Sequence, residues 1–436
     1  MMFKKLGALR GRRALLSRGA VYLFFAFFNR SLPFLLLPVY SRCLTPEDYG
    51  VYALFLTAVT IANPFLTLCW HNALAYIYFN ESFEIRRYVS SFLLVSLGLL
   101  ALQEGALYLL TFVPLGRWAV PTFLLLAPVN ALGMILISVV AAMWQVRERP
   151  LAFGLFQLFC AAAKATMNLC SVFLLRLGWR GLLASETLFY LIGIAVSLTL
   201  LYRAGWLGWA FDRRHLKVGL KLGLGFFPGT LANILNDSIG RILLADRFSV
   251  DAVGVYSMGQ KLGTVAGLYT TSLHNVYQPW FFKKVNQGGK DLGRKIFRSL
   301  VLASSSILIF SGTAGLAMQL ISSFVLGSAF RGAMPYFWLS LLSFSIVGIY
   351  GLLGYVIYST GRTWILSCLT GMAALTNISL TWIFLNVFGV IGAGYASVLA
   401  WLLILLVAIP VTLREWRRHI ARPLPTSNKA AGHDPR

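Results

Sequence analysis

The segments GVYALFLTAVTIANPFLTLCWHNALAYIYFN (residues 50–80) and GVYSMGQKLGTVAGLYTTSLHNVYQPWFFKK (residues 254–284) indicate that the chain is built from two related halves. Both begin with Gly-Val-Tyr, and one single-residue gap also aligns a later His-Asn pair, at offsets of 204 and then 203 residues. Because similarity at a fixed offset is the signature of internal repeats, we favour duplication over chance agreement. The aligned pairs are His71-Asn72 and His274-Asn275.

The composition of the whole chain is that of a membrane protein. Of the 436 residues, 58% are hydrophobic and only 12% are charged, and the mean hydropathy is +0.74. A soluble domain carries about 25% charged residues. The net charge of +24 therefore does not indicate a basic soluble protein, and we expect an all-α integral membrane protein that crosses the bilayer many times.

The five cysteines form neither a disulfide framework nor a metal site. They are scattered singly, without a paired-cysteine motif and without His or Asp at metal-ligand spacing. We interpret them as small apolar fillers within the spans, and we expect no metal and no cofactor. They are Cys43, Cys69, Cys160, Cys170 and Cys368.

Twelve apolar stretches reach the length of about 18 residues that a spanning helix needs. A basic segment precedes the first stretch, but no small-residue cleavage site closes it, so we expect a retained first span and no signal peptide. The predicted spans are 14–40, 51–78, 90–111, 119–144, 151–175, 182–202, 218–245, 252–282, 299–319, 334–358, 364–386 and 389–413.

The loops between these spans differ strongly in basic charge. Loops on one side, with both termini, hold 28 Lys and Arg residues, and loops on the other side hold six. Cytoplasmic loops are the ones enriched in Lys and Arg, so both termini are predicted to be cytoplasmic. The positive excess then faces anionic membrane lipids, and no nucleic-acid partner is expected.

An even number of spans in each half makes the repeat parallel, with a pseudo-two-fold axis along the membrane normal. Two six-helix lobes related in this way are expected to enclose a central cavity. The predicted division is an N-terminal lobe at 1–203, a cytoplasmic linker at 204–217, a C-terminal lobe at 218–413 and a cytoplasmic tail at 414–436.

Two further stretches resemble a known family. RSLPFLLLPVYSRCLTPEDYGVYAL (residues 30–54) has a proline-containing first span, Arg42 and the loop LTPEDYG, and it is similar to polysaccharide-export flippases of the Wzx type. LKLGLGFFPGTLANILNDSIGRILLADRFSVDAVGVYSMGQKLG (residues 220–263) looks like the seventh and eighth spans of that family, including Asn236 to Arg241. These flippases belong to the multidrug/oligosaccharidyl-lipid/polysaccharide (MOP) exporter superfamily, together with multidrug (MATE) exporters and the lipid II flippase.

The resemblance implies a flippase in the inner (cytoplasmic) membrane of a bacterium. Its substrate would be an undecaprenyl-diphosphate-linked oligosaccharide, moved from the cytoplasmic to the periplasmic leaflet by alternating access for O-antigen (lipopolysaccharide) or exopolysaccharide biosynthesis. Implied partners are the lipid-linked oligosaccharide, membrane lipids, a proton or sodium counter-ion and polysaccharide assembly proteins.

Seven ionisable residues fall well inside the predicted spans. Each costs roughly 3 kcal/mol at the bilayer centre, so seven facing lipid would lose on the order of 20 kcal/mol, more than the net stability of a typical domain. They are therefore expected to face a wet cavity or one another, and intramembrane charge is characteristic of a transport pathway. They are Arg30, Glu104, Lys164, Glu186, Asp237, Arg241 and Lys261.

The four basic residues of this set, Arg30, Lys164, Arg241 and Lys261, suit a diphosphate, because Arg binds phosphate bidentately and Lys offers a point charge. Asn233 and Asn236 share a polar face of the seventh span with Asp237 and Arg241, and we assign both to the substrate cavity. The alternative for Asp237 and Arg241, four residues apart, is a pair that only locks helices together.

The acidic residues Glu104, Glu186 and Asp237 have two open roles. They could neutralise the basic residues through salt bridges, or they could couple transport to an ion gradient. Burial raises the pKa of a carboxyl group and would make the second role feasible. The sequence does not choose between the two.

Prolines and histidines suggest a gate. Pro33 and Pro38 in the first span parallel Pro228 in the seventh, and proline can kink a span, either to form a gate or as a passive bend. His71 and His274 occupy matching repeat positions and could relay a proton, or simply hydrogen-bond between helix ends.

Other functions account for the sequence less well. A MATE-like multidrug exporter would favour an acid-dominated cavity for cationic drugs, and the lipid II flippase usually has two further spans. A membrane-bound glycolipid polymerase or ligase would need a long catalytic loop, whereas outer loops here stay below roughly 15 residues and no Walker, HExxH or GxSxG motif occurs. We therefore expect a transporter and not an enzyme. A non-transporting scaffold would tolerate loss of the intramembrane charges.

Overall fold

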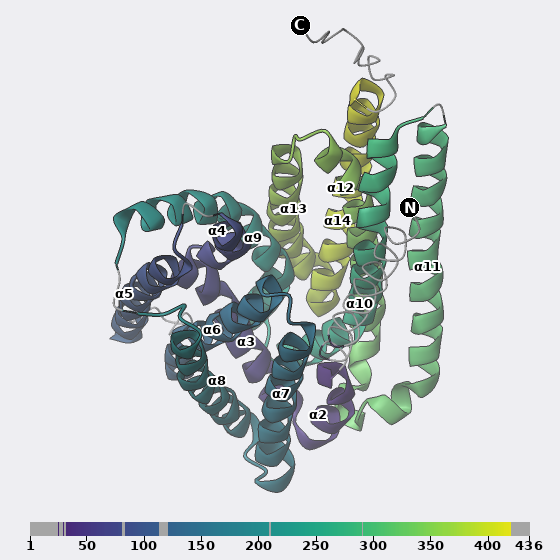
Figure 1. Ribbon diagram of the computed structural model, residues 1–436. Helices are drawn as coiled ribbons and strands as arrows, with labels where there is room; N and C mark the ends of the chain where they lie inside the picture. Colours follow the sequence, from purple (N-terminus) through teal and green to yellow (C-terminus); the bar gives the residue numbers. More distant parts are fainter. Residues whose placement is uncertain are drawn as a thin grey trace, which may run out of the picture.

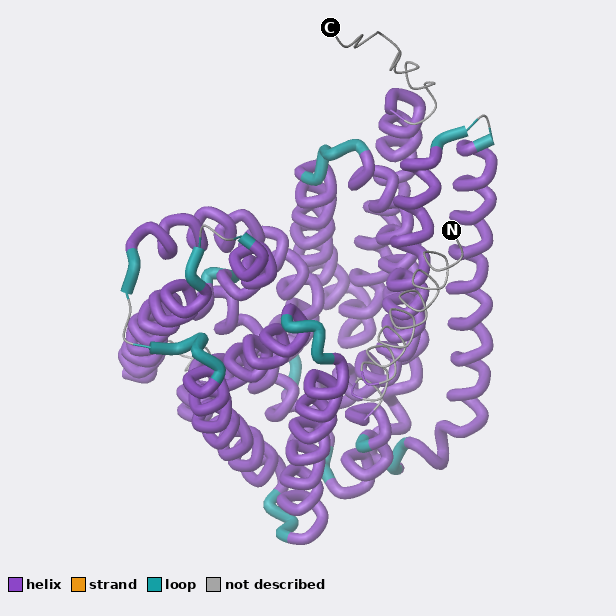
Figure 2. Tube along the Cα trace, viewed as in Figure 1, coloured by secondary structure: helices purple, strands orange, loops and turns teal. Residues whose placement is uncertain are grey.

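The computed structural model describes residues 32–80, 83–112, 121–208, 211–289 and 291–419, together with Phe25 and Asn29. Most of the first predicted span, including Arg30, lies outside the described residues, as do residues 420–436 of the tail. The described part of the chain is helical without strands (Figures 1 and 2). Its α-helices are α2 (Leu37–Cys43), α3 (Pro46–Thr67), α4 (Leu74–Phe79), α5 (Ile85–Phe112), α6 (Ala127–Val146), α7 (Pro150–Leu169), α8 (Gly178–Arg203), α9 (Arg213–Arg247), α10 (Val250–Gln287), α11 (Leu292–Val325), α12 (Met334–Ser359), α13 (Trp364–Phe388) and α14 (Gly392–His419).

These helices confirm the all-α, twelve-span architecture. Nine segments of the described chain are long and apolar enough to cross a membrane, and the last of them, 364–418, contains both α13 and α14. The remaining spans are the first, of which residues 32–43 are described, and α10, which is 38 residues long but more polar. Most observed helices extend beyond the predicted spans, because polar and basic residues continue the helix past the apolar stretch, as in the first turns of α9.

The second span of each half begins in the same way. Before α3, the Thr45 hydroxyl accepts from the Asp48 amide at 3.1 Å and the Asp48 carboxylate accepts from the Thr45 amide at 3.1 Å. Before α10, the Ser249 hydroxyl accepts from the Ala252 amide at 3.2 Å. These caps satisfy backbone groups that the helix itself leaves free.

Thr45→Ala is expected to lower the free energy of unfolding by about 1 kcal/mol, because it removes the side-chain acceptor of the α3 cap. Thermal unfolding of the detergent-solubilised protein measures the change. Thr45→Ser keeps the hydroxyl and is the matched control, and equal midpoints for the alanine and serine variants would contradict the cap's contribution.

The second span of the N-terminal half is broken, which the sequence did not predict. The break follows α3, where Leu68 and Cys69 adopt left-handed conformations with φ of 47° and 57°. A 3-10 turn, η1 (Trp70–Ala73), then leads into α4. The equivalent helix of the second half, α10, runs without interruption.

The long helix α9 contacts helices of both halves. Its beginning packs on the N-terminal half, where a Cβ on Gly223 would lie 2.3 Å from the carbonyl oxygen of Leu68. Its end packs on α13, where the Asn377 amide donates to the carbonyl oxygen of Asn236 at 3.0 Å. Figure 1 shows α9 passing from the group formed by α3–α8 to the group formed by α10–α14. The division at residues 203 and 218 stays a prediction.

Candidate substrate cavity

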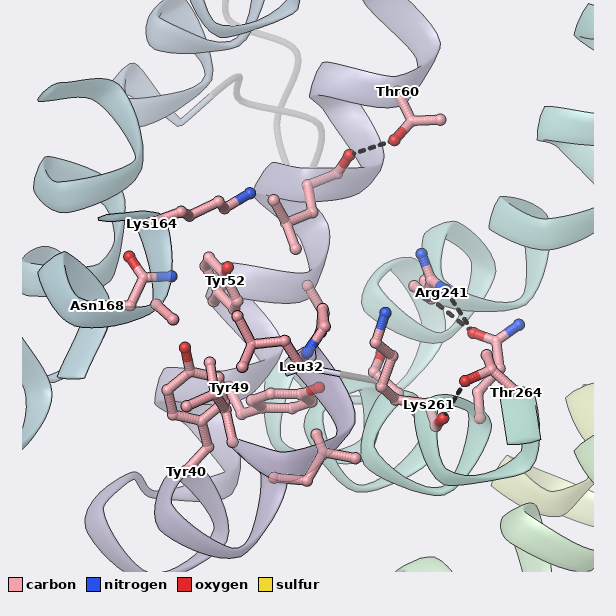
Figure 3. Close-up of a pocket in the computed structure, with 18 of the residues that line it drawn as sticks. Leu32, Tyr40, Tyr49, Tyr52, Thr60, Lys164, Asn168, Arg241, Lys261 and Thr264 are labelled. Carbon is pink, nitrogen blue, oxygen red and sulfur yellow. Dashed lines mark hydrogen bonds between the residues drawn. The ribbon is translucent and has the colours of Figure 1, made fainter. Parts of the chain in front are cut away.

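A cavity of about 440 Å³ lies between the two groups of helices. One wall comes from the first span and α3, a second from α7, and a third from α9 and α10 (Figure 3). Its polar and aromatic lining residues are Tyr40, Tyr49, Tyr52, Thr60, Lys164, Asn168, Asp237, Arg241, Ser257, Gln260, Lys261 and Thr264. The apolar lining includes Leu32, Pro33, Leu36, Leu37, Leu56 and Phe344.

The internal repeat recurs in the walls of this cavity. Ala53 and Thr60 of α3 line it, and so do Ser257 and Thr264 of α10, which lie 204 residues further along. Positions three, four and seven apart share one face of a helix. Equivalent faces of the two equivalent helices therefore meet at the same cavity, which is the arrangement that a parallel duplication predicts.

On the α7 side, Lys164 is held by a buried network. Its Nζ lies 2.8 Å from Oε2 of Glu186, whose side chain is fully buried, and also donates to the Tyr190 hydroxyl at 3.3 Å. Glu186 in turn accepts from the Tyr52 hydroxyl and from the Asn168 amide. The positive charge of Lys164 is thus balanced inside the protein.

On the opposite wall, Arg241 of α9 connects three helices. Its Nε donates to Oε1 of Gln260 on α10 at 3.0 Å, and its Nη1 donates to the Thr57 hydroxyl on α3 at 2.9 Å. Asp237, one turn earlier on α9, also lines the cavity. Within the described residues no ion pair joins Asp237 to Arg241 within 4.0 Å, so the guanidinium uses neutral acceptors.

Lys261 lies beside this cluster with its side chain exposed to the cavity (Figure 3). Among the described residues, its Nζ has no hydrogen-bond or ion-pair partner, unlike the Nζ of Lys164. Among the described lining residues, free basic charge is therefore concentrated on the α9–α10 wall. A ligand with an anionic group would find its electrostatic partner on that wall.

A smaller cavity of about 210 Å³ lies within the C-terminal group. Asn233, Asn236 and Asp237 line it from α9 and Gln260 from α10, so Asp237 and Gln260 belong to both cavities. The predicted polar face of the seventh span therefore divides. Arg241 faces the central cavity, and the two asparagines face the C-terminal group.

The remaining predicted site residues lie in several places. Pro33 lines the central cavity, Pro38 is the second residue of α2, and Pro228 lies inside α9. Glu104, on α5, and His71, in η1, do not line either cavity.

His274 of α10 also lies away from both cavities. Its Nε2 is 3.0 Å from the Gly348 carbonyl oxygen on α12, and its ring packs edge-on against Tyr355. This contact joins two helices of the same group. The partner is a backbone carbonyl group and not the neighbouring asparagine, and the two roles considered for His274 stay predictions.

The structure adds uncharged site residues that the sequence reasoning missed, namely Thr57, Gln260, Tyr52, Asn168 and Tyr190. The selection began from residues charged at neutral pH and added only the asparagines beside them on the seventh span, so it did not include these five. Threonine, asparagine and tyrosine occur widely in membrane helices, so their presence alone carries no signal. Thr57 and Thr60 lie 204 residues before Lys261 and Thr264, at equivalent positions of the repeat. This correspondence is the pattern that could have identified the cavity-facing side of α3.

Similar proteins place the chain in a family. The model of the polysaccharide biosynthesis protein family matches residues 15–285. A protein of Haemophilus influenzae described as an uncharacterized membrane protein is 26% identical over 425 residues, covering 92% of this chain and 98% of that protein.

Two solved structures share the fold. The lipid II flippase MurJ in an inward closed conformation has a TM-score of 0.69 at 16% identity, covering 92% of this chain and 90% of that chain. The MATE multidrug transporter DinF-BH has a TM-score of 0.62 at 14% identity, covering 93% and 96%. At these identities the likeness shows the fold alone. The family match covers more than half of the sequence, so the chain belongs to the polysaccharide biosynthesis protein family.

Proposed function

We propose that the protein moves an undecaprenyl-diphosphate-linked oligosaccharide from the cytoplasmic to the periplasmic leaflet, for O-antigen or exopolysaccharide biosynthesis. The observation that carries this proposal is that Arg241 and Lys261 lie on the same wall of the central cavity. Among the described residues, the Nζ of Lys261 has no hydrogen-bond or ion-pair partner. A diphosphate is the headgroup element that such a wall would bind, because both residues donate to phosphate oxygens.

The other walls suit the rest of such a substrate. Tyrosines and Asn168 offer hydroxyl and amide groups for sugar hydroxyls, and leucines of the first span offer an apolar surface for the lipid. A MATE-like exporter of cationic drugs is less well supported, because Glu186 is occupied by Lys164. Asp237 is then the one acidic side chain among the described lining residues, and it shares its wall with the two basic residues Arg241 and Lys261.

The proposed orientation follows the loop charges. The end of the bundle with the α2–α3 and α9–α10 turns is poor in lysine and would be periplasmic, and the end with the α10–α11 turn would be cytoplasmic. Proton or sodium coupling is part of the proposal, with Glu186 and Asp237 as its candidates. Glu104 is the weakest of the three because it lies on α5 away from the cavity, whereas Asp237 lines the cavity and Glu186 binds the lining residue Lys164.

Reconstituted vesicles test the function. Protein-containing vesicles should expose a labelled undecaprenyl-diphosphate-linked oligosaccharide to an external lectin faster than protein-free vesicles, while the glycan keeps its length. Equal rates would contradict the proposal, and new glycosidic bonds would support the polymerase or ligase alternative.

A further inference from the structure

The periplasmic end of the cavity, in the orientation proposed above, is closed by direct contact between α3 and α10. A Cβ on Gly50 would lie 2.1 Å from the Val250 carbonyl oxygen, and a Cβ on Gly254 would lie 1.8 Å from the Pro46 carbonyl oxygen. Only glycine permits backbones to approach this closely. Gly254 and Val250 lie 204 residues after Gly50 and Pro46, so the two contacts are equivalent under the internal repeat. The crossing is therefore pseudo-symmetric.

A second contact seals the same end beside the crossing. The Ser41 hydroxyl of α2 donates to the Val325 carbonyl oxygen at 2.9 Å and accepts from the Gly327 amide at 3.1 Å. The Arg42 guanidinium donates to the Phe324 carbonyl oxygen. These bonds use backbone groups at the end of α11, so they form only while the two groups of helices lie together.

The helix faces that meet at the two glycines continue into the cavity. Thr57 follows Gly50 by seven residues, and Lys261 follows Gly254 by seven. Seven residues are nearly two helical turns, about 10 Å, so each pair shares a face. Thr57 and Lys261 are therefore equivalent positions just above the crossing, and Arg241 bonds to the first of them.

The Arg241–Thr57 bond joins the two groups of helices at the floor of the cavity. Arg241 lies on the part of α9 that packs on α13, with Asn236 bonded to Asn377 five residues earlier. Thr57 lies on α3 and is buried. The bond thus holds the groups together on the cavity side of the glycine crossing.

We propose that this hydrogen bond is a latch on the crossing of Gly50 and Gly254, and that the substrate diphosphate releases it; the release rests on the function proposed above. A threonine hydroxyl is a neutral acceptor, whereas a phosphate oxygen forms a stronger, charge-assisted bond with a guanidinium. A diphosphate bound at Lys261 would draw Arg241 away from Thr57. Binding would then favour the opened state by removing a bond that exists only in the closed one.

The glycine crossing suits repeated opening. The atoms that meet Gly254 are backbone atoms of Pro46 and Gly50, and Gly50 meets the backbone and one methyl group of Val250, so separation requires little side-chain repacking at that point. Once the latch is released, the bonds of Ser41 and Arg42 to the end of α11 are the remaining polar contacts described at this seal.

Cysteine labelling tests the latch. Thr60 lines the cavity above the crossing, so a cysteine placed there by Thr60→Cys becomes reachable from outside when the crossing opens. The substitution is made in a protein whose five native cysteines are changed to alanine and which still exports polysaccharide. The rate at which an impermeant maleimide, added outside right-side-out vesicles, labels this cysteine measures opening. Thr57→Val should raise the labelling rate about tenfold, because a bond to a charged group is lost. Thr57→Ser should leave the rate unchanged. Undecaprenyl diphosphate loaded into the vesicles should raise the labelling rate of the protein that retains Thr57, and much less that of Thr57→Val.

Gly254→Ala provides a second, independent variant. Its Cβ obstructs the closed crossing, so labelling should rise, whereas Gly98→Ala on α5 meets no atom within 4 Å and should change nothing. Equal labelling of Thr57→Val and Thr57 proteins would overturn the latch and leave the proposed function standing. Raised labelling in Thr57→Val, with no response of the Thr57 protein to undecaprenyl diphosphate, would overturn the ligand and with it the proposed function.

Discussion

Lys261→Ala is expected to slow translocation of the lipid-linked oligosaccharide by about tenfold to a hundredfold, because a hydrogen bond to a charged group contributes about 1.5–3 kcal/mol. The side chain is exposed to the cavity and, among the described residues, has no partner of its own. Its removal therefore breaks no internal contact, and the loss falls on the ligand. The initial rate in reconstituted vesicles measures the effect.

Two variants make this result specific. Lys261→Arg keeps the charge and a phosphate donor and should retain most of the rate. Lys283→Ala removes an exposed lysine near the other end of α10 and should behave like the unaltered protein. Normal translocation by Lys261→Ala, at equal amounts of folded protein, would remove the basis for diphosphate binding at this wall.

Glu186→Ala is expected to lower the free energy of unfolding by about 3 kcal/mol, because it leaves the Lys164 charge without its buried partner. It also removes the acceptor of the Tyr52 hydroxyl. Removing one partner of a buried ion pair costs about 3–5 kcal/mol of stability. We expect the lower value here, because the Lys164 side chain is 30% exposed and reaches the cavity. Thermal unfolding in detergent measures the change.

The double variant Lys164→Met, Glu186→Leu separates stability from transport. Replacing both charges by apolar residues of similar size should restore most of the stability. If transport also recovers, the pair is structural and does not couple an ion gradient. If the double variant is stable but inactive, Lys164 or Glu186 acts in transport. A single Glu186→Ala variant as stable as the unaltered protein would contradict the buried pair itself.

The number of spans was predictable because it depends on apolar length alone, and each of the twelve stretches exceeds what a folded loop would carry. Most predicted spans are shorter than the observed helices. The apolar stretch does not include helical turns outside the bilayer, such as the basic first turns of α9. The break after α3 was not predictable, because Leu68 and Cys69 have no intrinsic preference for positive φ. Tertiary contact with Gly223 accompanies it.

Selecting charged residues inside the spans identified part of the cavity lining, but it also included residues that do not line the cavity. Lys164, Asp237, Arg241 and Lys261 line the cavity, whereas Glu104 does not. Insertion cost predicts that a charge avoids lipid, but it does not tell a cavity from a protein interior. Glu186 illustrates the difference, because its fully buried carboxylate is satisfied by Lys164, Tyr52 and Asn168. Such partners come from helices whose neighbours the sequence does not specify.

The different continuity of the two equivalent helices has a mechanical consequence. α10 is one rod of 38 residues, so a displacement at its periplasmic end is carried along its whole length. α3 ends at Thr67, and two residues with φ near 50° separate it from η1 and α4. If the two halves separate at the glycine crossing, α10 would carry the displacement through the C-terminal half as a rigid helix, while the N-terminal half would absorb part of the rotation at the break next to α9.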